Sequence, residues 1–219
     1  MALTLYFHPL SSFCMKALIA LYENDTPFEP RVIHLEKPES RAELAALWPL
    51  AKFPVITDTK NGETVVVAES STIIEYLDEH YPGKSKLVPT TAARARRARH
   101  VERIHDLYIN MPVGKFAVDT YRPEGKKDPL GVAEAMTSIE TAYGVIEKEL
   151  ANNTWAIGDD FTMADCAAAP ALFFANHLIP LKNKHQNIAA YLGRLMERPS
   201  VARVMREAAP FLKMFPGSK

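Results

Sequence analysis

The stretch AKFPVITDTKNGETVVVAESSTIIEYLDEHYPG, residues 51–83, decides the fold of this chain. Two runs rich in β-branched residues, 55–57 and 64–67, flank Asn61 and Gly62. Asn-Gly is the strongest short-range signal of a tight β-hairpin, because both residues tolerate a positive φ. The hairpin leads directly into a helical pattern, whose apolar residues are Ile73, Ile74, Leu77 and Tyr81. The stretch therefore predicts a hairpin followed by a helix, which a Pro-Gly pair ends.

Both ends of the predicted hairpin carry residues that suggest ligand binding. Pro54 precedes a strand, and a cis Phe53–Pro54 bond would turn the backbone of Phe53 away from the sheet, where an extended peptide can pair with it. Ser70 and the first N–H groups of the helix form a natural carboxylate site, and Glu69 supplies the opposite charge for an ammonium group. The sequence therefore predicts a site for the α-amino-acid end of a ligand.

The residues before this stretch alternate between strand and helix. A strand over 2–7 ends at a His-Pro pair, and a helix over 13–23, a strand over 28–35 and a short helix over 38–47 follow. The resulting order, βαβαββα, predicts one parallel pair of strands and one antiparallel hairpin pair. We therefore expect residues 1–82 to form an α/β domain of thioredoxin-like layout.

The chain after residue 89 is predicted to be helical. A linker containing proline and glycine ends there, and helical periodicity then occurs in five segments: 91–118, 128–150, 163–178, 188–196 and 200–208. Thr162 and Asp165 form a capping-box pattern before the most apolar of these segments, which indicates that they are folding residues. We expect residues 90–219 to form an all-helical domain.

Composition narrows the classes of function. The 26 Lys and Arg residues balance the 26 Asp and Glu residues, so the chain lacks the basic footprint of a nucleic-acid-binding protein. No apolar run approaches the roughly 20 residues of a membrane span, and the first residues lack a leader pattern. Two cysteines argue against a disulfide scaffold, and none of the seven histidines has metal-ligand spacing. We therefore expect a cytoplasmic protein without a metal, a membrane partner or a nucleic-acid partner.

The motifs K-F-P-V at 52–55 and E-S-S-T-I-I-E-Y-L at 69–77 resemble the glutathione site of the glutathione transferases, and the resemblance covers essentially the whole chain. In that family a cis-proline presents backbone to the cysteinyl part of glutathione, and a Glu/Gln-Ser pair binds the γ-glutamyl end. The resemblance implies four glutathione contacts: Phe53, Pro54, Glu69 and Ser70.

Two lysines are candidates for the glycine carboxylate of glutathione. Lys52 matches the family position that faces this carboxylate, and Lys37 is the second candidate. Both residues also fit the pattern of solvated surface lysines. The usual N-P-x-G-K before the proline is here Trp-Pro-Leu-Ala-Lys, residues 48–52, so this loop departs from the family pattern.

The residue that activates the glutathione thiol is expected in the loop H-P-L-S-S-F-C-M-K, residues 8–16. A free thiol has a pKa near 8.5, and a helix N-terminus together with a hydroxyl donor lowers it. Alignment with serine-type family members places Ser11 on the catalytic hydroxyl. Ser12 is the second choice and Tyr6 the third, and both serines also suit helix capping. Cys14 is expected to be a core thiol, because serine replaces the first cysteine of a redox C-x-x-C pattern.

The resemblance also implies a site for a hydrophobic second substrate. We expect it between Phe13 and the long helix, near His105, Tyr108 and Met111, although the same residues would suit helix packing. Asp106 on that helix is a candidate for reaching the glutathione of a partner subunit. The arginines at 94, 96, 97 and 99 fit a solvated or dimer-facing surface better than a nucleic-acid patch.

These features predict a homodimeric, serine-type cytosolic glutathione transferase. It would activate glutathione for attack on a hydrophobic electrophile or for reduction of an organic peroxide. Two alternatives stay open. One is a glutathione-dependent isomerase of the maleylacetoacetate type, whose members carry Ser-Ser followed directly by Cys, whereas this chain has Phe13 between them. The other is a binding or stress protein that has kept the fold without catalysis.

Overall fold

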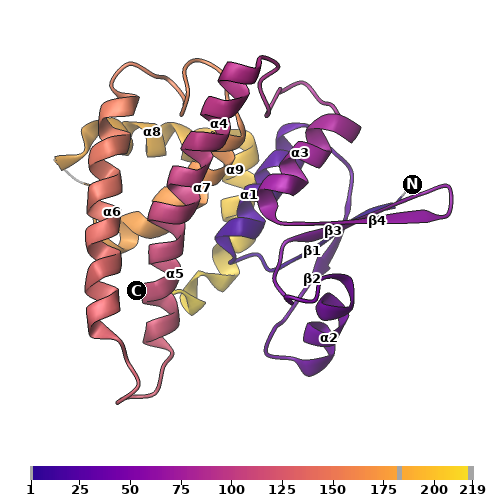
Figure 1. The fold of residues 1–219 in the computed structure, drawn as a ribbon, viewed down its shortest axis with the longest axis horizontal. Coiled ribbons are helices and arrows are strands. Elements are labelled where there is room, and N and C mark those ends of the chain that lie inside the picture. The colour runs from indigo at the N-terminus through magenta and orange to yellow at the C-terminus, as the bar shows by residue number, and fades with distance from the viewer. Residues whose placement is uncertain (1, 182–183, 217–219) are drawn as a thin grey trace.

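The computed structural model describes residues 2–181 and 184–216, which form a thioredoxin-like α/β domain followed by a helical domain (Figure 1). The α/β domain contains β1 (Ala2–Phe7), α1 (Ser12–Glu23), β2 (Glu29–Val32), α2 (Pro38–Leu47), β3 (Val55–Lys60), β4 (Glu63–Ala68) and α3 (Ser70–His80). Its sheet has the order β2-β1-β3-β4. Strands β1 and β2 are parallel, and β3 is antiparallel to both of its neighbours. The predicted fold class, the order of the elements along the chain and the directions of the strand pairs are confirmed.

Successive side chains of a strand point to opposite faces of the sheet, and helices cover both faces. Ile56 of β3 belongs to the large core shared with α1 and α3, whereas its neighbour Val55 packs with Ile33 and Leu44 in a small cluster at α2. Strand β2 is shorter than the predicted 28–35. It is an exposed edge strand that contains a proline, which cannot donate to a ladder and is confined to such edges.

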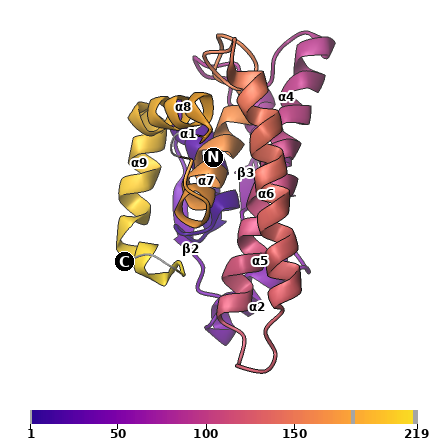
Figure 2. The same cartoon turned by 90° about the vertical axis from the view of Figure 1, so that its left-hand side faces the viewer.

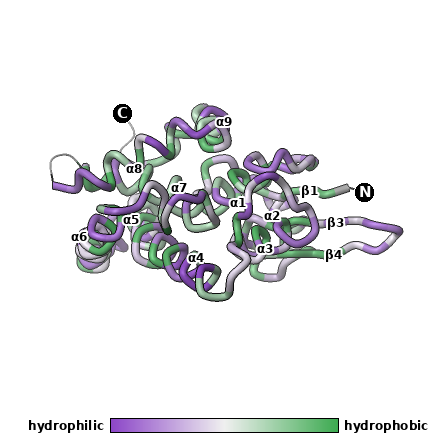
Figure 3. Tube along the Cα trace, turned by 90° about the horizontal axis from the view of Figure 1, so that it is seen from above, coloured by the Kyte–Doolittle hydropathy of each residue, from purple (hydrophilic) through white to green (hydrophobic). Residues whose placement is uncertain are grey.

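The predicted hairpin turn is confirmed at Asn61 and Gly62, which have φ values of 53° and 85°. The hairpin of β3 and β4 reaches beyond the rest of the sheet, and its tip is hydrophilic (Figure 3). Charged residues at the tip, Lys60 and Glu63, pair across the turn in the strand register. The turn therefore sets the register that places Val55 opposite Ala68 at the far end of the hairpin.

The sheet register brings three loops to one edge. Tyr6 pairs with Val55, and Val55 pairs with Ala68, so the end of β1, the start of β3 and the end of β4 lie side by side. The ring of His8, in the loop after β1, stacks on the ring of Phe53 with the ring centroids 6.2 Å apart. The loops that carry Ser11, Pro54 and Ser70 therefore meet at this edge.

The helical domain is built around one buried helix, α7 (Met163–Leu178), which packs against α1 and α4 and lies in the middle of the bundle (Figure 2). The other elements are α4 (Ala92–His105), the π-helical segment η1 (Asp106–Asn110), α5 (Met111–Thr120), α6 (Pro129–Leu150), α8 (Gln186–Glu197), α9 (Pro199–Ala208) and the 3-10 segment η3 (Ala209–Met214). The prediction of a helical second half is confirmed.

The capping box at the start of α7 is confirmed as a folding feature. The Asp165 carboxylate accepts hydrogen bonds from the backbone N–H of Thr162 and of Ala156, both at 2.8 Å, and from the Tyr191 hydroxyl at 2.6 Å. Asp165 is fully buried, so these donors replace the water that a carboxylate would otherwise bind. The residue therefore joins α7, α8 and the loop before α7.

The predicted long helix over 91–118 is interrupted by the π segment η1. A π turn uses i→i+5 hydrogen bonds, so the residues after it are rotated relative to a regular α-helix. Helix packing, the alternative considered for Tyr108 and Met111, is not observed, because each residue is 55% exposed. The side chains of α5 therefore face in other directions than they would if α4 continued as one regular α-helix.

The loop before Pro54 allows a stability prediction. Ala51 has a φ of 49°, and the left-handed region costs a residue with a Cβ about 1–2 kcal/mol. Replacing Ala51 with glycine should raise the free energy of unfolding by about 1 kcal/mol, after the greater flexibility of glycine in the unfolded chain is subtracted. The control is Ala93→Gly on the exposed face of α4, which should lower stability by about 1 kcal/mol. Urea unfolding of both variants measures the difference, and a destabilised Ala51→Gly would contradict the strain argument.

Candidate functional site

The loop before β3 and the start of α3 form one half of the candidate site. The Phe53–Pro54 peptide bond is cis, as predicted. Ser70 is the first residue of α3 and is buried, whereas Glu69 before it is exposed and has a φ of 69°. A positive φ is uncommon for glutamate, and such residues concentrate at ligand sites. The free N–H groups at the start of α3 therefore lie at the same sheet edge as Pro54, an arrangement that suits a carboxylate.

The two candidate lysines lie at the surface near this edge. Lys52 is exposed and immediately precedes Phe53, and Lys37 is exposed at the start of α2. Neither forms an ion pair with a carboxylate in the part of the chain that the structure describes. Both side chains are therefore free to bind an anionic group from solvent.

The loop between β1 and α1 forms the other half of the candidate site. Ser11 is the N-cap of α1, and its Oγ accepts a hydrogen bond from the backbone N–H of Cys14 at 3.4 Å. A hydroxyl that accepts one hydrogen bond still has its own proton to donate. Ser12 is the first residue of α1. The positive end of the α1 dipole and a free hydroxyl donor thus coincide at Ser11.

An apolar cleft of about 590 Å³ opens beside these serines. It lies between the loop before α1, the end of η1 with α5, helix α7 and the C-terminal segment. Its apolar lining includes Leu10, Phe13, Met111, Val113, Phe174 and Phe215. The arrangement can hold an apolar molecule next to a group bound at Ser11.

Two residues predicted for the hydrophobic site do not line this cleft. His105 is buried, and its Nδ1 lies 2.9 Å from the backbone carbonyl oxygen of Val101, one turn back in α4. Burial lowers the pKa of His105 to about 4, so its ring is neutral. Tyr108 is exposed on η1 and is absent from the cleft lining. His105 belongs to α4, before the π segment, and lies beside α6, whereas Tyr108 lies within the π segment itself. Phe13 and Met111 are the predicted residues that the structure does bring to the cleft.

The remaining candidates near Ser11 belong to the core. Cys14 is fully buried, and burial raises its pKa to about 12, so it stays a protonated thiol at neutral pH. Tyr6 packs against the small cluster at α2, not against the cleft. Cys166 is buried in α7, and burial raises its pKa as well. None of these groups is placed to activate a thiol beside Ser11.

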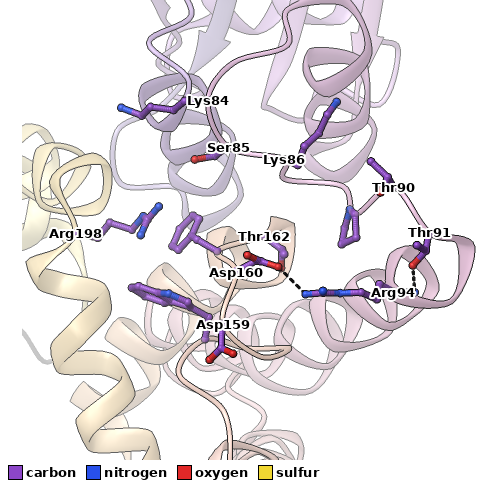
Figure 4. A pocket seen from close by; sticks show the side chains of 13 residues that line it. Lys84, Ser85, Lys86, Thr90, Thr91, Arg94, Asp159, Asp160, Thr162 and Arg198 are labelled. Carbon is purple, nitrogen blue, oxygen red and sulfur yellow. Dashed lines mark hydrogen bonds and ion pairs between the residues drawn. The ribbon is translucent and has the colours of Figure 1, made fainter.

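A second cavity, of about 530 Å³, lies between the interdomain linker and the loop before α7 (Figure 4). Its four cationic residues already have acidic partners: Lys84 with Asp25, Lys86 with Asp78, Arg94 with Asp160, and Arg198 with Glu23. Figure 4 shows Arg94 extended towards Asp160 across the cavity. This cavity is polar and its charges are compensated, so we favour the apolar cleft as the candidate site.

Three arginines of α4 are also paired. Arg94, Arg97 and Arg99 bind the carboxylates of Asp160, Glu149 and Glu75. Within residues 2–181 and 184–216, no helix is long and apolar enough to cross a membrane, and no cluster of three or more ligating side chains that could hold a metal ion is found.

A buried ionic cluster joins the two domains beneath the site. The Lys16 ammonium, on α1, binds the hydroxyl of Ser71 at 3.0 Å and the carboxylates of Asp106, at 2.6 Å, and Glu102. Lys16 and Glu102 are almost fully buried. The cluster therefore ties α1 to α3, α4 and η1. Asp106, predicted to reach a partner subunit, is held within its own chain.

The charge of this cluster gives a pH prediction. Burial raises the pKa of Asp106 to about 6, against about 3.9 in an unfolded chain. Between these values the folded state binds a proton that the unfolded state does not, so the Asp106 contribution to stability falls as pH rises from about 4 to about 6. Asp106→Asn should therefore gain stability relative to the natural protein over that interval. Urea unfolding at several pH values measures the difference, and parallel curves would contradict the raised pKa.

Sequence reasoning missed three residues of this region. The role of Lys16 was not predicted, because the two carboxylates that it binds lie far from it in the sequence. His8 contacts the rings of both Phe53 and Phe211, and Asn110 lines the cleft. The His-Pro break after the first strand was a signal for His8, and Pro112, two residues after Asn110, was a signal that the predicted helix is irregular there.

Comparison with known proteins identifies the family of the chain. Residues 5–85 match the family model of the glutathione S-transferase N-terminal domain, and residues 109–199 match that of the C-terminal domain. The chain belongs to the glutathione S-transferase family. The two matched segments contain both halves of the candidate site and most of the helices that line the apolar cleft.

Individual relatives of this glutathione S-transferase family member are distant but span its length. Glutathione S-transferase GstB of Escherichia coli is 23% identical, over 93% of this chain and 97% of the relative. Maleylacetoacetate isomerase maiA of Aspergillus fumigatus is 28% identical, over 94% and 91%. A glutathione S-transferase from Methylobacillus flagellatus, solved with glutathione bound, has a TM-score of 0.84 at 22% identity and covers 93% of this chain and 98% of its own. This structural likeness shows the fold.

Proposed function

We propose that this family member is a cytosolic glutathione transferase in which Ser11 stabilises the glutathione thiolate. The observation that carries the proposal is the convergence of two half-sites at one sheet edge: the N-cap hydroxyl of α1, and the cis-Pro54 loop with the start of α3. The apolar cleft beside Ser11 then receives the second substrate. This combination suits attack by a thiolate on a hydrophobic electrophile, or reduction of an organic peroxide.

The proposed glutathione contacts follow the sheet edge. The backbone of Phe53, next to Pro54, pairs with the cysteinyl part of the peptide. The N–H groups at Ser70 bind the γ-glutamyl carboxylate, and the exposed Glu69 carboxylate binds the ammonium group. Lys52, with Lys37 as second candidate, neutralises the glycine carboxylate. Positive charge at the α1 N-terminus and the Ser11 hydroxyl lower the thiol pKa.

The proposed second-substrate site uses Phe13 and Met111 together with the apolar cleft residues. His105 is omitted because its neutral ring is buried outside the cleft. We also propose a homodimer. Large apolar side chains are exposed on β4 and η1, namely Val65, Val66, Leu107 and Tyr108, and exposed apolar surface of this kind favours burial against a second copy. Sedimentation measures the state, and a monomer at micromolar concentration would contradict it.

The deciding experiment titrates the protein with glutathione and follows the ultraviolet absorbance of the thiolate against pH, with affinity measured by calorimetry. We expect bound glutathione to ionise well below the free thiol pKa of about 8.5. Binding without ionisation would leave a glutathione-binding protein without thiol activation and would refute the catalytic proposal. Absence of binding would refute the assigned site.

A glutathione-dependent isomerase is the second candidate, favoured by the similarity to the Aspergillus fumigatus maleylacetoacetate isomerase. A glutathione-dependent isomerisation would also use the glutathione proposed beside Ser11, so the glutathione half of the site would serve it. Phe13 separates Ser12 from Cys14 here, unlike the Ser-Ser-Cys pattern of the isomerases. An assay with maleylacetoacetate decides between the two, and turnover absent in that assay but present with an electrophile would exclude the isomerase.

A further inference from the structure

The turn that carries Ser11 is closed by His8. Residues 8–11 form a β-turn in which the backbone N–H of Ser11 donates to the carbonyl oxygen of His8 at 3.0 Å. Pro9 occupies the second position of the turn, which favours proline. The imidazole Nδ1 of His8 also accepts the backbone N–H of Leu10 at 3.2 Å, a pattern that asparagine and aspartate usually form in turns. His8 therefore holds the turn with both its backbone and its side chain.

Only a neutral imidazole can hold the turn in this way. A ring nitrogen accepts a hydrogen bond only when it carries no proton, so Nδ1 is the acceptor and Nε2 carries the proton. The surroundings favour this neutral form, because burial and the neighbouring His34 lower the pKa of His8, while the carboxylate of Glu36 acts in the opposite direction. In a protonated ring, Nδ1–H would face the N–H of Leu10, and the turn would lose its side-chain bond.

The ring of His8 is held by aromatic side chains from both domains. It stacks on Phe53 with the ring centroids 6.2 Å apart and the planes at 22°, and it meets the ring of Phe211 edge to face at 5.3 Å. These are geometries that aromatic pairs favour. Phe53 directly precedes the cis bond to Pro54, and Phe211 belongs to η3 of the helical domain. The ring therefore fixes the cis-proline loop relative to the turn that carries Ser11.

Two parts of one side chain thus make two different kinds of contact. Nδ1 serves the half of the site at Ser11, and the ring serves the half at Phe53. A phenylalanine would keep the ring contacts without the acceptor, and an asparagine would supply an acceptor to the turn without the ring. Histidine combines both, which a residue that only packed this edge of the sheet would not need.

We propose that His8 is a positioning residue of the glutathione site with two separable tasks. Its Nδ1 locks the turn that presents the Ser11 hydroxyl to the glutathione thiol, and its ring fixes the loop whose Phe53 backbone pairs with the peptide. The inference rests on the proposed function and adds a residue that acts through Ser11 and Phe53. It predicts that thiol ionisation and glutathione affinity depend on different parts of the same side chain.

The test measures these two properties separately. Ultraviolet absorbance against pH gives the acid dissociation constant of bound glutathione. Calorimetry with S-methylglutathione gives the affinity for the peptide, because its sulfur has no proton to lose and binding is then separated from ionisation. Both measurements are made on the natural protein and on two variants, His8→Phe and His8→Asn.

His8→Phe keeps the ring and leaves the N–H of Leu10 without its acceptor. We expect the acid dissociation constant of bound glutathione to fall about three- to tenfold, the range that corresponds to the loss of one hydrogen bond between neutral groups. The dissociation constant of S-methylglutathione should change less than about twofold, because the support of Phe53 is intact.

His8→Asn should give the opposite pattern, because it keeps an acceptor for the turn and removes the ring. The dissociation constant of S-methylglutathione should rise about three- to tenfold, the range for lost aromatic pairs. The acid dissociation constant of bound glutathione should stay within about twofold, since the turn is still closed. His100→Asn, which changes an exposed histidine of α4, is the matched control and should change neither property.

Each variant tests its own half of the inference, so one suffices if urea unfolding shows that the other does not fold. Parallel losses of ionisation and affinity in either variant would overturn the inference, because a general loosening of this edge affects both. Unchanged values in both variants would also overturn it, and either result leaves the proposed transferase function standing. A natural protein that fails to bind or to ionise glutathione would refute the proposed function itself, and the role of His8 with it.

Discussion

Replacing Ser11 with alanine should lower the turnover of an electrophile by on the order of 100-fold, with little change in glutathione affinity. The hydroxyl lies at the N-terminus of α1 and keeps its proton free to donate while its oxygen accepts from Cys14. Alanine removes the donor but leaves the helix N-terminus and the contacts proposed at Pro54 and Ser70. The pKa of bound glutathione should therefore rise towards that of the free thiol. Thiolate absorbance and steady-state kinetics measure the two effects separately.

The same substitution removes a helix cap, which costs about 1 kcal/mol. Activity should therefore be measured where the unfolding curve shows the variant to be fully folded. Ser12→Ala is the matched control, because Ser12 is the next residue and also lines the cleft. Full activity in Ser11→Ala with loss in Ser12→Ala would transfer the role to Ser12. Full activity in both would reject serine-type activation.

Replacing Lys16 with methionine should lower the free energy of unfolding by about 3–5 kcal/mol. Methionine fills a similar volume but leaves Glu102 and Asp106 as neighbouring carboxylates without their shared cation. Glu102 is almost fully buried, so water cannot replace the ammonium group. Thermal or urea unfolding measures the loss, which is a large fraction of the roughly 5–15 kcal/mol by which a protein is usually stable.

An exposed lysine and a compensated variant distinguish a buried charge effect from a general loss of packing. Lys84 forms an ion pair with Asp25 in which both side chains are mostly exposed, so Lys84→Met should change stability by less than about 0.5 kcal/mol. Adding Glu102→Gln to Lys16→Met removes one uncompensated carboxylate and should recover part of the stability. If the double variant were no more stable than Lys16→Met, the loss would come from packing and not from charge.

Local patterns in the sequence were sufficient to predict three features, two in the α/β domain and one in the helical domain. The Asn61-Gly62 turn, the proline before β3 and the capping box at Thr162 each depend on residues close together in the chain, and all three are confirmed. The two ends of strand β2 were less predictable. The run over 28–35 contains the strand-favouring residues Phe28, Val32 and Ile33. Only Glu29–Val32 pair with β1, because pairing depends on a strand that lies elsewhere in the sequence.

The cleft was predicted in the right region but with the wrong helix face. Helical periodicity assumes 3.6 residues per turn, and the π segment breaks that assumption between His105 and Met111. His105 precedes that segment and lies in the core beside α6, whereas Asn110 comes to the cleft. Pro112, inside the predicted helix, was the local signal of an irregularity at this point.

The sequence by itself determined the fold class, the glutathione transferase family and the positions of Ser11, Pro54, Glu69 and Ser70, because turn, cap and motif signals are encoded over a few neighbouring residues. Only the tertiary structure decided which side chains line the cleft and that Lys16 is buried between two carboxylates 86 and 90 residues away. The physical reason is that burial and ion pairing depend on how helices pack, and helix packing is set by contacts between segments that are distant in the chain.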